Sequence, residues 1–341
     1  MTSEAAASAP LPGEGSSYSI NHRKTRDAGE LASYSGKLDQ VYEQITPGQF
    51  NGQFVEIGFR GINLFRERTD QGTYQAGVMA AGSRMFAVAA SVQGQGRFCG
   101  HPITLDTLAM IDSGNEFDHR TPDILDVMCL SVSSELLAQY TFGSEQHEIA
   151  HAARDFPLVP VSNAQIARFR DTLATLHQAI CRAPSLLDFE AIQKGFEHAV
   201  LSAVVEVCAS VSDAARTPPS LATRRAIVSR AMDIMRERVE EPLTVEDICL
   251  ALGVSRRTLQ YSFQEILQVN PVAYLRALRL NGVRRSLKTA DPARDTVQDI
   301  AARWGFWHLS NFAIYYRRMF GELPSQTLHG RHDLKLSSAL Q

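Results

Sequence analysis

The sequence predicts an α+β protein with a β-rich N-terminal domain that also carries helices and an all-α C-terminal domain with two helix-turn-helix units. Three observations predict this organisation. Glycines interrupt short apolar stretches between about residues 50 and 132, and a polar segment with two prolines follows at residues 211–222. A five-residue phrase then occurs twice, 52 positions apart, at residues 244–248 (TVEDI) and 296–300 (TVQDI). A chain of 341 residues is long enough for two domains that each bury a core.

The first 45 residues are predicted to form a largely disordered lead. Ala, Ser, Gly and Pro dominate its beginning, and such a composition buries little apolar surface. One short helix is expected at residues 38–45.

Residues 46–210 are predicted to form the β-rich domain, with helices at its C-terminal end. Stretches rich in Val, Ile, Phe and Met are broken by frequent glycines as far as residue 132. Short strands with many turns are typical of a compact barrel or sandwich, so a β-rich, cupin-like barrel is expected.

A long helix is predicted at residues 163–182, with an apolar seam spaced 3, 4, 3, 4 along it. Its residues are Ile166, Phe169, Leu173, Leu176 and Ile180. A narrow seam of this kind is used by pairs of helices that pack along each other, which makes it a candidate for dimerisation. The alternative is that the seam covers its own barrel or packs on the next predicted helix, at residues 186–209.

Residues 211–222 are predicted to be a linker, because prolines and small polar residues favour an extended, solvated chain. The helical domain is expected at residues 223–331, followed by a frayed tail at 332–341. Each repeat in that domain opens on a threonine that can cap a helix, Thr244 or Thr296, with an acid three residues later. Each first helix ends at a glycine, Gly253 or Gly305, where a positive φ is accessible.

A second helix is predicted after each glycine. Its buried side carries a large apolar pair one turn apart, Leu259 with Phe263 in the first unit and Phe312 with Tyr316 in the second. Helix, tight turn and helix form the unit that places a second helix in the major groove of DNA.

The charge balance supports a polyanionic partner for the helical domain alone. Residues 224–331 hold 17 Lys and Arg against 11 Asp and Glu, a net charge of +6, which leaves −9 for the rest of a chain whose total is −3. Sixteen of those 17 cations are arginine, the side chain suited to bidentate bonds with phosphate and guanine.

The residues predicted to contact DNA lie on the outward faces of the second helices and beside them. In the first unit, Arg257 and Gln260 are the expected base readers and Arg256 a phosphate contact, with Tyr261 on the same face. In the second unit the outward residues are His308, Leu309, Ser310, Asn311 and Ile314, and the flanking cations are Arg303, Arg317 and Arg318. A helix at residues 271–288, roughly 27 Å long, would hold the two units about one DNA turn apart.

Residues from about 224 to 331 resemble the C-terminal DNA-binding domain of the AraC/XylS family of bacterial transcription regulators. The matching positions lie in both units. They are Ile248, Ala251, Gly253, Ser255, Leu259 and Phe263, then Ile300, Ala301, Gly305, Phe306, Phe312, Arg317, Phe320, Gly321 and Pro324. Residues 274–281 and 302–308 look most like the branch of ethanolamine-operon regulators. Gln268 departs from the family's usual glycine, and Ile314 from its usual polar reader.

The resemblance implies a regulator, in this family commonly an activator, that binds promoter DNA. It also implies an N-terminal domain that senses a small molecule or mediates dimerisation, and it implies RNA polymerase and a second copy of the chain as partners. No cofactor, catalytic residue or bound metal is expected.

One motif points to a different function. Residues 147–151 spell HExxH, in which His147 and His151 could hold Zn²⁺ and Glu148 could act as a general base, so a zinc hydrolase or a metal sensor is the alternative. The prolines at 157 and 160 leave room only for a short helix, and no GxxH third ligand follows.

The segment with Asp112, Glu116, Asp118 and His119 could line a pocket for an amine or could form a polar hairpin end. The N-terminus has neither a basic start nor an apolar core of a leader, and no apolar run approaches the roughly 20 residues that span a bilayer. A cytoplasmic protein with its five cysteines reduced is therefore expected.

Overall fold

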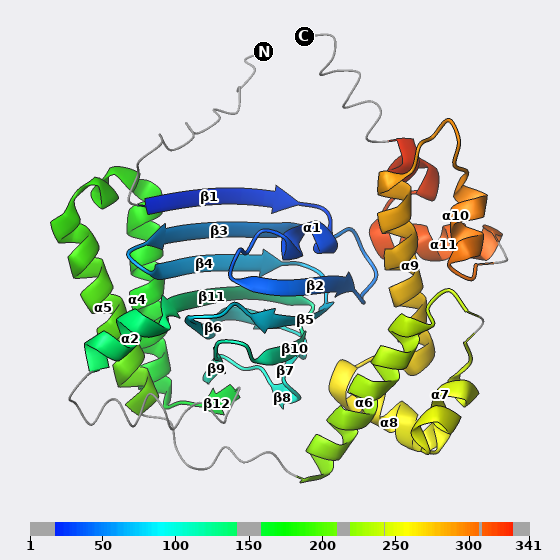
Figure 1. Cartoon of the computed structure of the whole chain (residues 1–341), viewed down its shortest axis with the longest axis horizontal. Coiled ribbons are helices and arrows are strands. Elements are labelled where there is room, and N and C mark those ends of the chain that lie inside the picture. Colours follow the sequence, from blue (N-terminus) through cyan, green and yellow to red (C-terminus); the bar gives the residue numbers. More distant parts are fainter. Residues whose placement is uncertain (1–17, 142–157, 210–218, 242, 307–308, 330–341) are drawn as a thin grey trace.

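The computed structural model describes residues 18–141, 158–209, 219–241, 243–306 and 309–329. Its N-terminal part holds two antiparallel sheets, and its C-terminal part is entirely helical. Figure 1 shows the sheets in the middle, with helices α4 and α5 on one side and helices α6 to α11 on the other. The predicted fold class is therefore confirmed.

The larger sheet has seven strands in the order β1-β3-β4-β11-β6-β9-β12. Their bounds are Tyr18–Thr25 (β1), Gly52–Phe59 (β3), Ile62–Thr69 (β4), Ile124–Ser133 (β11), Ser83–Gln93 (β6), Thr107–Ile111 (β9) and Leu158–Pro160 (β12). The β3–β4 hairpin turns through Arg60 and Gly61, with φ of 46° and 76°, and Phe59 pairs with Ile62. Two positive φ angles in a two-residue loop give the turn whose twist matches the strands.

The smaller sheet has five strands in the order β2-β5-β10-β7-β8. Their bounds are Leu38–Gln44 (β2), Thr73–Met79 (β5), Glu116–Arg120 (β10), Arg97–Phe98 (β7) and His101–Pro102 (β8). The strands of the two sheets do not pair with each other among the described residues, so the expected barrel is in fact two stacked sheets. One apolar cluster, with Phe54 and Phe65 from one sheet and Phe117 from the other, lies between them.

The lead predicted to be disordered is structured from residue 18 onward. It contains β1, helix α1 (Ala28–Ala32) and β2, and β2 replaces the short helix expected at residues 38–45. In β2 the side chains of Leu38, Gln40 and Tyr42 lie on the face towards the other sheet, which is the period of two of a strand.

Helices cover the outer face of the larger sheet. They are α2 (Ser134–Thr141), α4 (Asn163–Arg182), the 3₁₀ helix η2 (Pro184–Asp188) and α5 (Glu190–Ala209). The five seam residues of α4, from Ile166 to Ile180, are all buried in the cluster formed with strands β3, β4, β6 and β11 and with α5. The predicted dimerisation seam is thus corrected: it packs on its own domain, because the sheet and α5 already occupy its apolar surface.

The helical domain consists of α6 (Pro219–Glu237), α7 (Val245–Leu252), α8 (Arg256–Leu267), α9 (Pro271–Thr289), α10 (Val297–Arg303) and α11 (Leu309–Phe320). Helix α6 begins inside the segment predicted to be a linker, whose residues 211–218 lie outside the described ranges, as does the predicted tail at 332–341. All five cysteines are free. Within the described ranges, no helix has the length and apolarity that crossing a membrane requires.

Candidate nucleic-acid interface

The first helix-turn-helix unit consists of α7 and α8, and its local structure follows from its caps. The Thr244 hydroxyl accepts a hydrogen bond from the Asp247 backbone N–H at 3.2 Å, and the Asp247 carboxylate accepts one from the Thr244 N–H at 2.9 Å. Gly253 ends α7 with a φ of 64°, and Ser255 caps α8. The predicted capping box and glycine stop are both present.

The outward face of α8 holds the predicted readers. Arg256, Arg257, Gln260 and Tyr261 are all exposed, and together with Gln264 they line a shallow hollow. Gln264 was not predicted, although it lies seven residues after Arg257 and so falls on the same face. The Arg257 guanidinium lies over the Tyr261 ring, 5.3 Å from its centroid, and Arg256 pairs with Glu246 at 2.8 Å.

The second unit consists of α10 and α11. Thr296 caps α10, and the turn contains Gly305 with a φ of 79°. The rings of Phe312, Tyr316 and Phe320 contact one another in sequence inside the unit, with centroids 5.6 and 4.7 Å apart. This aromatic column holds α11 against the rest of the domain.

The outward residues of the second unit are partly apolar. Ile314 is 63% exposed and Leu309 38% exposed, and Asn311, Arg303, Arg317 and Arg318 are exposed as well. His308 lies outside the described residues, and Ser310 lies in the first turn of α11. Apolar side chains of this kind can contact thymine methyl groups.

Helix α9 connects the units over 19 residues, about 28 Å. Its Gly282 lies against the ring of Trp304, the residue that follows α10, so close that an added Cβ would come within 2.2 Å of Cζ3. Its Arg276 lies over the Tyr315 ring of α11 at 4.4 Å. Gly282 and Arg276 thus fix α9 to the second unit.

The N-terminal domain contacts both units through the smaller sheet and α1. For the first unit, the Arg120 Nε donates to the Leu267 carbonyl at the end of α8, at 3.1 Å. Asp118 pairs with Arg225 of α6, the helix that packs on α8. For the second unit, the Gln44 side-chain amide donates to the Met319 carbonyl of α11 at 2.6 Å. The placement of α8 and α11 therefore depends on this domain interface.

Two carboxylates at the interface bind groups on α9. Glu43 is buried and accepts a hydrogen bond from the Tyr274 hydroxyl at 3.0 Å; burial raises the pKa of Glu43, although Arg236 opposes the rise. Asp27 contacts Arg284 at 3.1 Å and Lys288 at 2.8 Å. Burial acts to raise the pKa of Asp27, but Lys288 and Arg284 outweigh it, so the pKa lies below its usual value.

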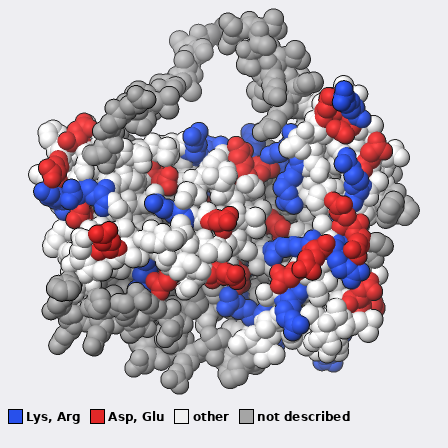
Figure 2. Space-filling view, viewed as in Figure 1, with Lys and Arg blue, Asp and Glu red and all other residues white. Residues whose placement is uncertain are grey.

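The cationic surface is less uniform than the sequence count indicates. Arg284 is buried at the interface and also contacts Glu322, and Arg279 donates to the carbonyls of Val239 and Glu241. Figure 2 shows basic and acidic side chains interspersed over the helical domain on the face in view. Some of the cations counted in the sequence are therefore engaged inside the protein and do not contribute to a basic surface.

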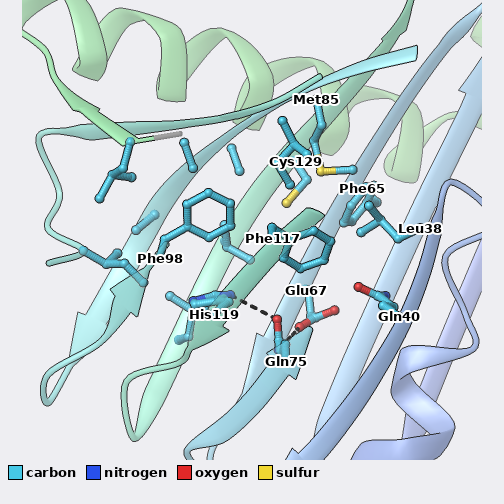
Figure 3. A pocket seen from close by; sticks show the side chains of 18 of the residues that line it. Leu38, Gln40, Phe65, Glu67, Gln75, Met85, Phe98, Phe117, His119 and Cys129 are labelled. Carbon is cyan, nitrogen blue, oxygen red and sulfur yellow. Dashed lines mark hydrogen bonds between the residues drawn. The ribbon is translucent and has the colours of Figure 1, made fainter. Parts of the chain in front are cut away.

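A cavity of about 80 Å³ lies between the two sheets. Its walls are mostly apolar, but Glu67, Gln75, His119 and Gln40 lie along one edge, as Figure 3 shows. The Gln75 amide N–H is 3.4 Å from Glu67, and its carbonyl is 3.0 Å from His119 Nδ1. The Tyr42 hydroxyl donates to the other Glu67 oxygen at 3.0 Å.

Burial changes the acidity of the two titratable groups in this row. It raises the pKa of Glu67 to about 7. Burial, together with the Arg120 charge, lowers the pKa of His119 to about 3, so the imidazole is neutral.

The residues of the acidic segment noted in the sequence do not form one site. His119 faces the cavity, whereas Asp118 faces the helical domain and Asp112 pairs with Arg84 at 2.9 Å. Glu116 is exposed. His147 and His151 lie outside the described residues, and no group of three metal-ligating side chains occurs within the described ranges.

Comparisons with known proteins agree on the helical domain. Residues 248–330 match the family model described as "Helix-turn-helix domain". A probable thc operon regulatory protein of Rhodococcus erythropolis is 41% identical over 102 residues, which are 30% of this chain and 31% of that protein. XylDLEGF operon transcriptional activator 2 of Pseudomonas putida is 32% identical over 106 residues, 31% of this chain and 67% of that one.

A solved structure is also similar in sequence. It is a transcriptional regulator of Chromobacterium violaceum with an AraC-type DNA-binding domain, 31% identical to this chain. The match covers 32% of this chain and 96% of that one, with a TM-score of 0.30. The matched segment spans about a third of the Rhodococcus relative, so the likeness is that of a domain.

Proposed function

The chain belongs to the AraC/XylS family of transcription regulators, and from that premise we propose that it binds promoter DNA in a sequence-specific manner and responds to a small molecule. The observation that carries the proposal is the outward face of α8, where Arg257, Gln260, Tyr261 and Gln264 are exposed beside one another. Arginine and glutamine there suit the edges of guanine and adenine.

Roles on the two units follow from their chemistry. Arg257 and Gln260 read bases, Gln264 extends the same face, and Arg256 contacts phosphate once it leaves Glu246. Leu309 and Ile314 contact thymine methyls in a second major-groove segment, and Asn311 is exposed on the same helix. Arg303, Arg317 and Arg318 bind phosphates and set the register.

The response to a small molecule is supported by the position of the cavity. Strand β10 alternates between its two faces: His119 lines the cavity, and its neighbours Asp118 and Arg120 bond to the helical domain. A ligand that binds better to one arrangement of this strand than to another shifts the population of the two.

Regulation, rather than catalysis, is the function of the named relatives. We infer that the protein works in the cytoplasm, where promoter DNA is found, and that RNA polymerase is a partner of the DNA-bound form. A homodimer and activation of transcription remain predictions from the family resemblance, as does the ethanolamine-type assignment. No observation on the described residues favours the zinc hydrolase.

The test is selection of bound sequences from a random DNA pool by the full-length protein, followed by titration of the selected site. Arg257→Ala is expected to lose roughly 1–3 kcal/mol at one base position, about 5- to 150-fold, and to relax specificity there. Arg257→Lys keeps the charge but loses the bidentate geometry, so it should lose the same discrimination. Arg230→Ala, at an exposed position of α6, controls for the loss of one cation.

Two results would contradict the proposal. An equal loss on every sequence would restrict Arg257 to phosphate contact. Failure of the wild-type protein to enrich any sequence would refute sequence-specific binding altogether.

A further inference from the structure

The cavity between the sheets has room for a compact organic molecule. One water needs roughly 10–15 Å³ of such space, so a volume of about 80 Å³ corresponds to about five to eight waters. Most of the wall is apolar: Phe98, Phe117, Met85 and Cys129 lie beyond the polar row in Figure 3. An apolar body of roughly benzene size fits this part.

The polar row is rich in acceptors. Gln75 turns its amide N–H groups towards Glu67 and Thr73, so its carbonyl accepts from His119 Nδ1. The Nδ1 atom then carries the imidazole proton, and Nε2 is an acceptor. His119 Nε2 and Gln40 Oε1 are both buried, and neither has a hydrogen-bond partner in the part of the chain that the structure describes. A buried acceptor of this kind is costly to leave unpaired, which makes a donor in the cavity favourable.

The charge in the cavity acts against anions. Among the residues that the structure describes, those lining the cavity include one acid, Glu67, and neither Lys nor Arg. His119 is neutral and cannot supply a positive charge. A carboxylate brought into this space would lose its hydration without gaining a cation, beside an existing carboxyl group.

We propose that this cavity binds a compact apolar molecule whose polar end donates hydrogen bonds, a phenol, alcohol or amine, and that it excludes carboxylates. The polar end donates a hydrogen bond to His119 Nε2 or to Gln40 Oε1. The apolar body lies against the rings of Phe98 and Phe117, which stack on each other with centroids 6.0 Å apart. This assignment rests on the proposed function, in which a ligand of the N-terminal domain regulates DNA binding.

The test uses four probes that share one ring: benzyl alcohol, benzylamine, benzoate and toluene. Their binding to the full-length protein is measured by calorimetry at pH 7. Benzyl alcohol or benzylamine should bind about tenfold more tightly than toluene, and benzoate should not bind at millimolar concentration. The relative affinity of benzyl alcohol and benzylamine assigns the head group of the natural ligand. Tighter binding of benzylamine indicates an ammonium group paired with Glu67, and tighter binding of benzyl alcohol indicates a hydroxyl group.

A variant ties the preference to one atom. His119→Phe keeps a ring of similar shape but removes the acceptor, so the alcohol and the amine should fall to the affinity of toluene while toluene itself is unaffected. His22→Phe, the same exchange at an exposed position of β1, should leave all four affinities unchanged. The wild-type series alone decides the matter if the His119 variant does not fold.

The possible results test the proposed ligand class separately from the proposed function. Benzoate binding as tightly as benzyl alcohol, or none of the four binding, overturns the assignment even when the protein still binds its selected DNA site. Tight binding of the alcohol or amine without a change in DNA affinity supports the assignment and refutes regulation through this cavity. If the protein without any probe does not bind DNA, the proposed function is refuted, and the assignment of the ligand class is not affected.

Discussion

Replacing the buried carboxyl group of the cavity by an amide, Glu67→Gln, should stabilise the protein at alkaline pH and not at acid pH. Burial raises the pKa of Glu67 from 4.5 to about 7. The folded protein therefore holds this proton more tightly than the unfolded chain does. The stability contributed by the protonated group is fully present below pH 4.5, declines as the pH rises towards 7, and is gone above that.

The magnitude follows from the shift of the pKa. Each pKa unit corresponds to about 1.4 kcal/mol, so ionised Glu67 lowers the free energy of unfolding by about 3 kcal/mol at pH 8. Glutamine keeps an oxygen that can accept from the Tyr42 hydroxyl but presents an N–H group to Gln75, which costs about 1 kcal/mol. The net gain at pH 8 is about 2 kcal/mol, and at pH 4.5 a loss of about 1 kcal/mol remains.

Urea unfolding from pH 4.5 to pH 8 measures this difference. Circular dichroism follows the whole chain, whereas both tryptophans, at positions 304 and 307, report the helical domain alone. Glu116→Gln, at an exposed position of β10, is the control and should change stability little at any pH. Since His119 is present in both proteins, its own titration cancels in the comparison. A stability difference between Glu67→Gln and wild type that stays constant across the pH range would refute the reasoning.

Three further predictions concern packing and the interface. Gly282→Ala should lower the free energy of unfolding by about 1–3 kcal/mol, because the added Cβ overlaps the Trp304 ring; urea unfolding followed by fluorescence measures the change. The control is Gly195→Ala on α5, which has open space around it and should not destabilise the protein. Gln268→Gly should raise the thermal stability of the helical domain by about 1 kcal/mol, since φ there is 58° and glycine adopts it without strain. Asp27→Asn should lower the free energy of unfolding by about 2 kcal/mol at pH 7, measured by urea titration, because the buried Arg284 guanidinium keeps only Glu322 of its two carboxylate partners and Lys288 loses its contact as well.

The helical domain was predictable from local chemistry. Thr244 and Gly253 specify the ends of α7 through their own backbone requirements, and the same signals recur at Thr296 and Gly305. Such capping signals involve residues within one helical turn of each other, so they can be recognised in the sequence alone. The departure at Gln268 also has a local meaning, because it occupies a left-handed position at the end of α8.

The N-terminal domain was less predictable because its decisive contacts are distant in sequence. Strand β2 carries Asp39, Val41 and Glu43 on the face away from the cavity, and Glu43 is buried against the helical domain, where Tyr274 bonds to it. The apolar residues of α4 have a spacing that suits packing on a sheet as well as packing on a second helix, so the spacing alone does not identify the partner. The cavity itself draws its lining from both sheets, between Leu38 and Leu158, so no local pattern reveals it.

Arg284 illustrates how an interface changes the meaning of a residue. In the sequence it is one of several cations on a helix between two DNA-reading units. In the fold it is buried against Asp27, more than 250 positions earlier, and lies over the Phe320 ring at 4.5 Å. Its charge is therefore committed to holding the N-terminal domain, and it is unavailable to phosphate.

The two helix-turn-helix units are connected to different parts of the N-terminal domain. The first unit is linked to β10 through Arg120, and β10 also carries His119 in the wall of the cavity. The second unit is linked to β2 through Gln44, and to α1 through Asp27, which binds α9. A ligand bonded to His119 therefore acts most directly on the end of α8. Since a ligand shifts an equilibrium only by its differential affinity, the first unit should respond to it more strongly than the second.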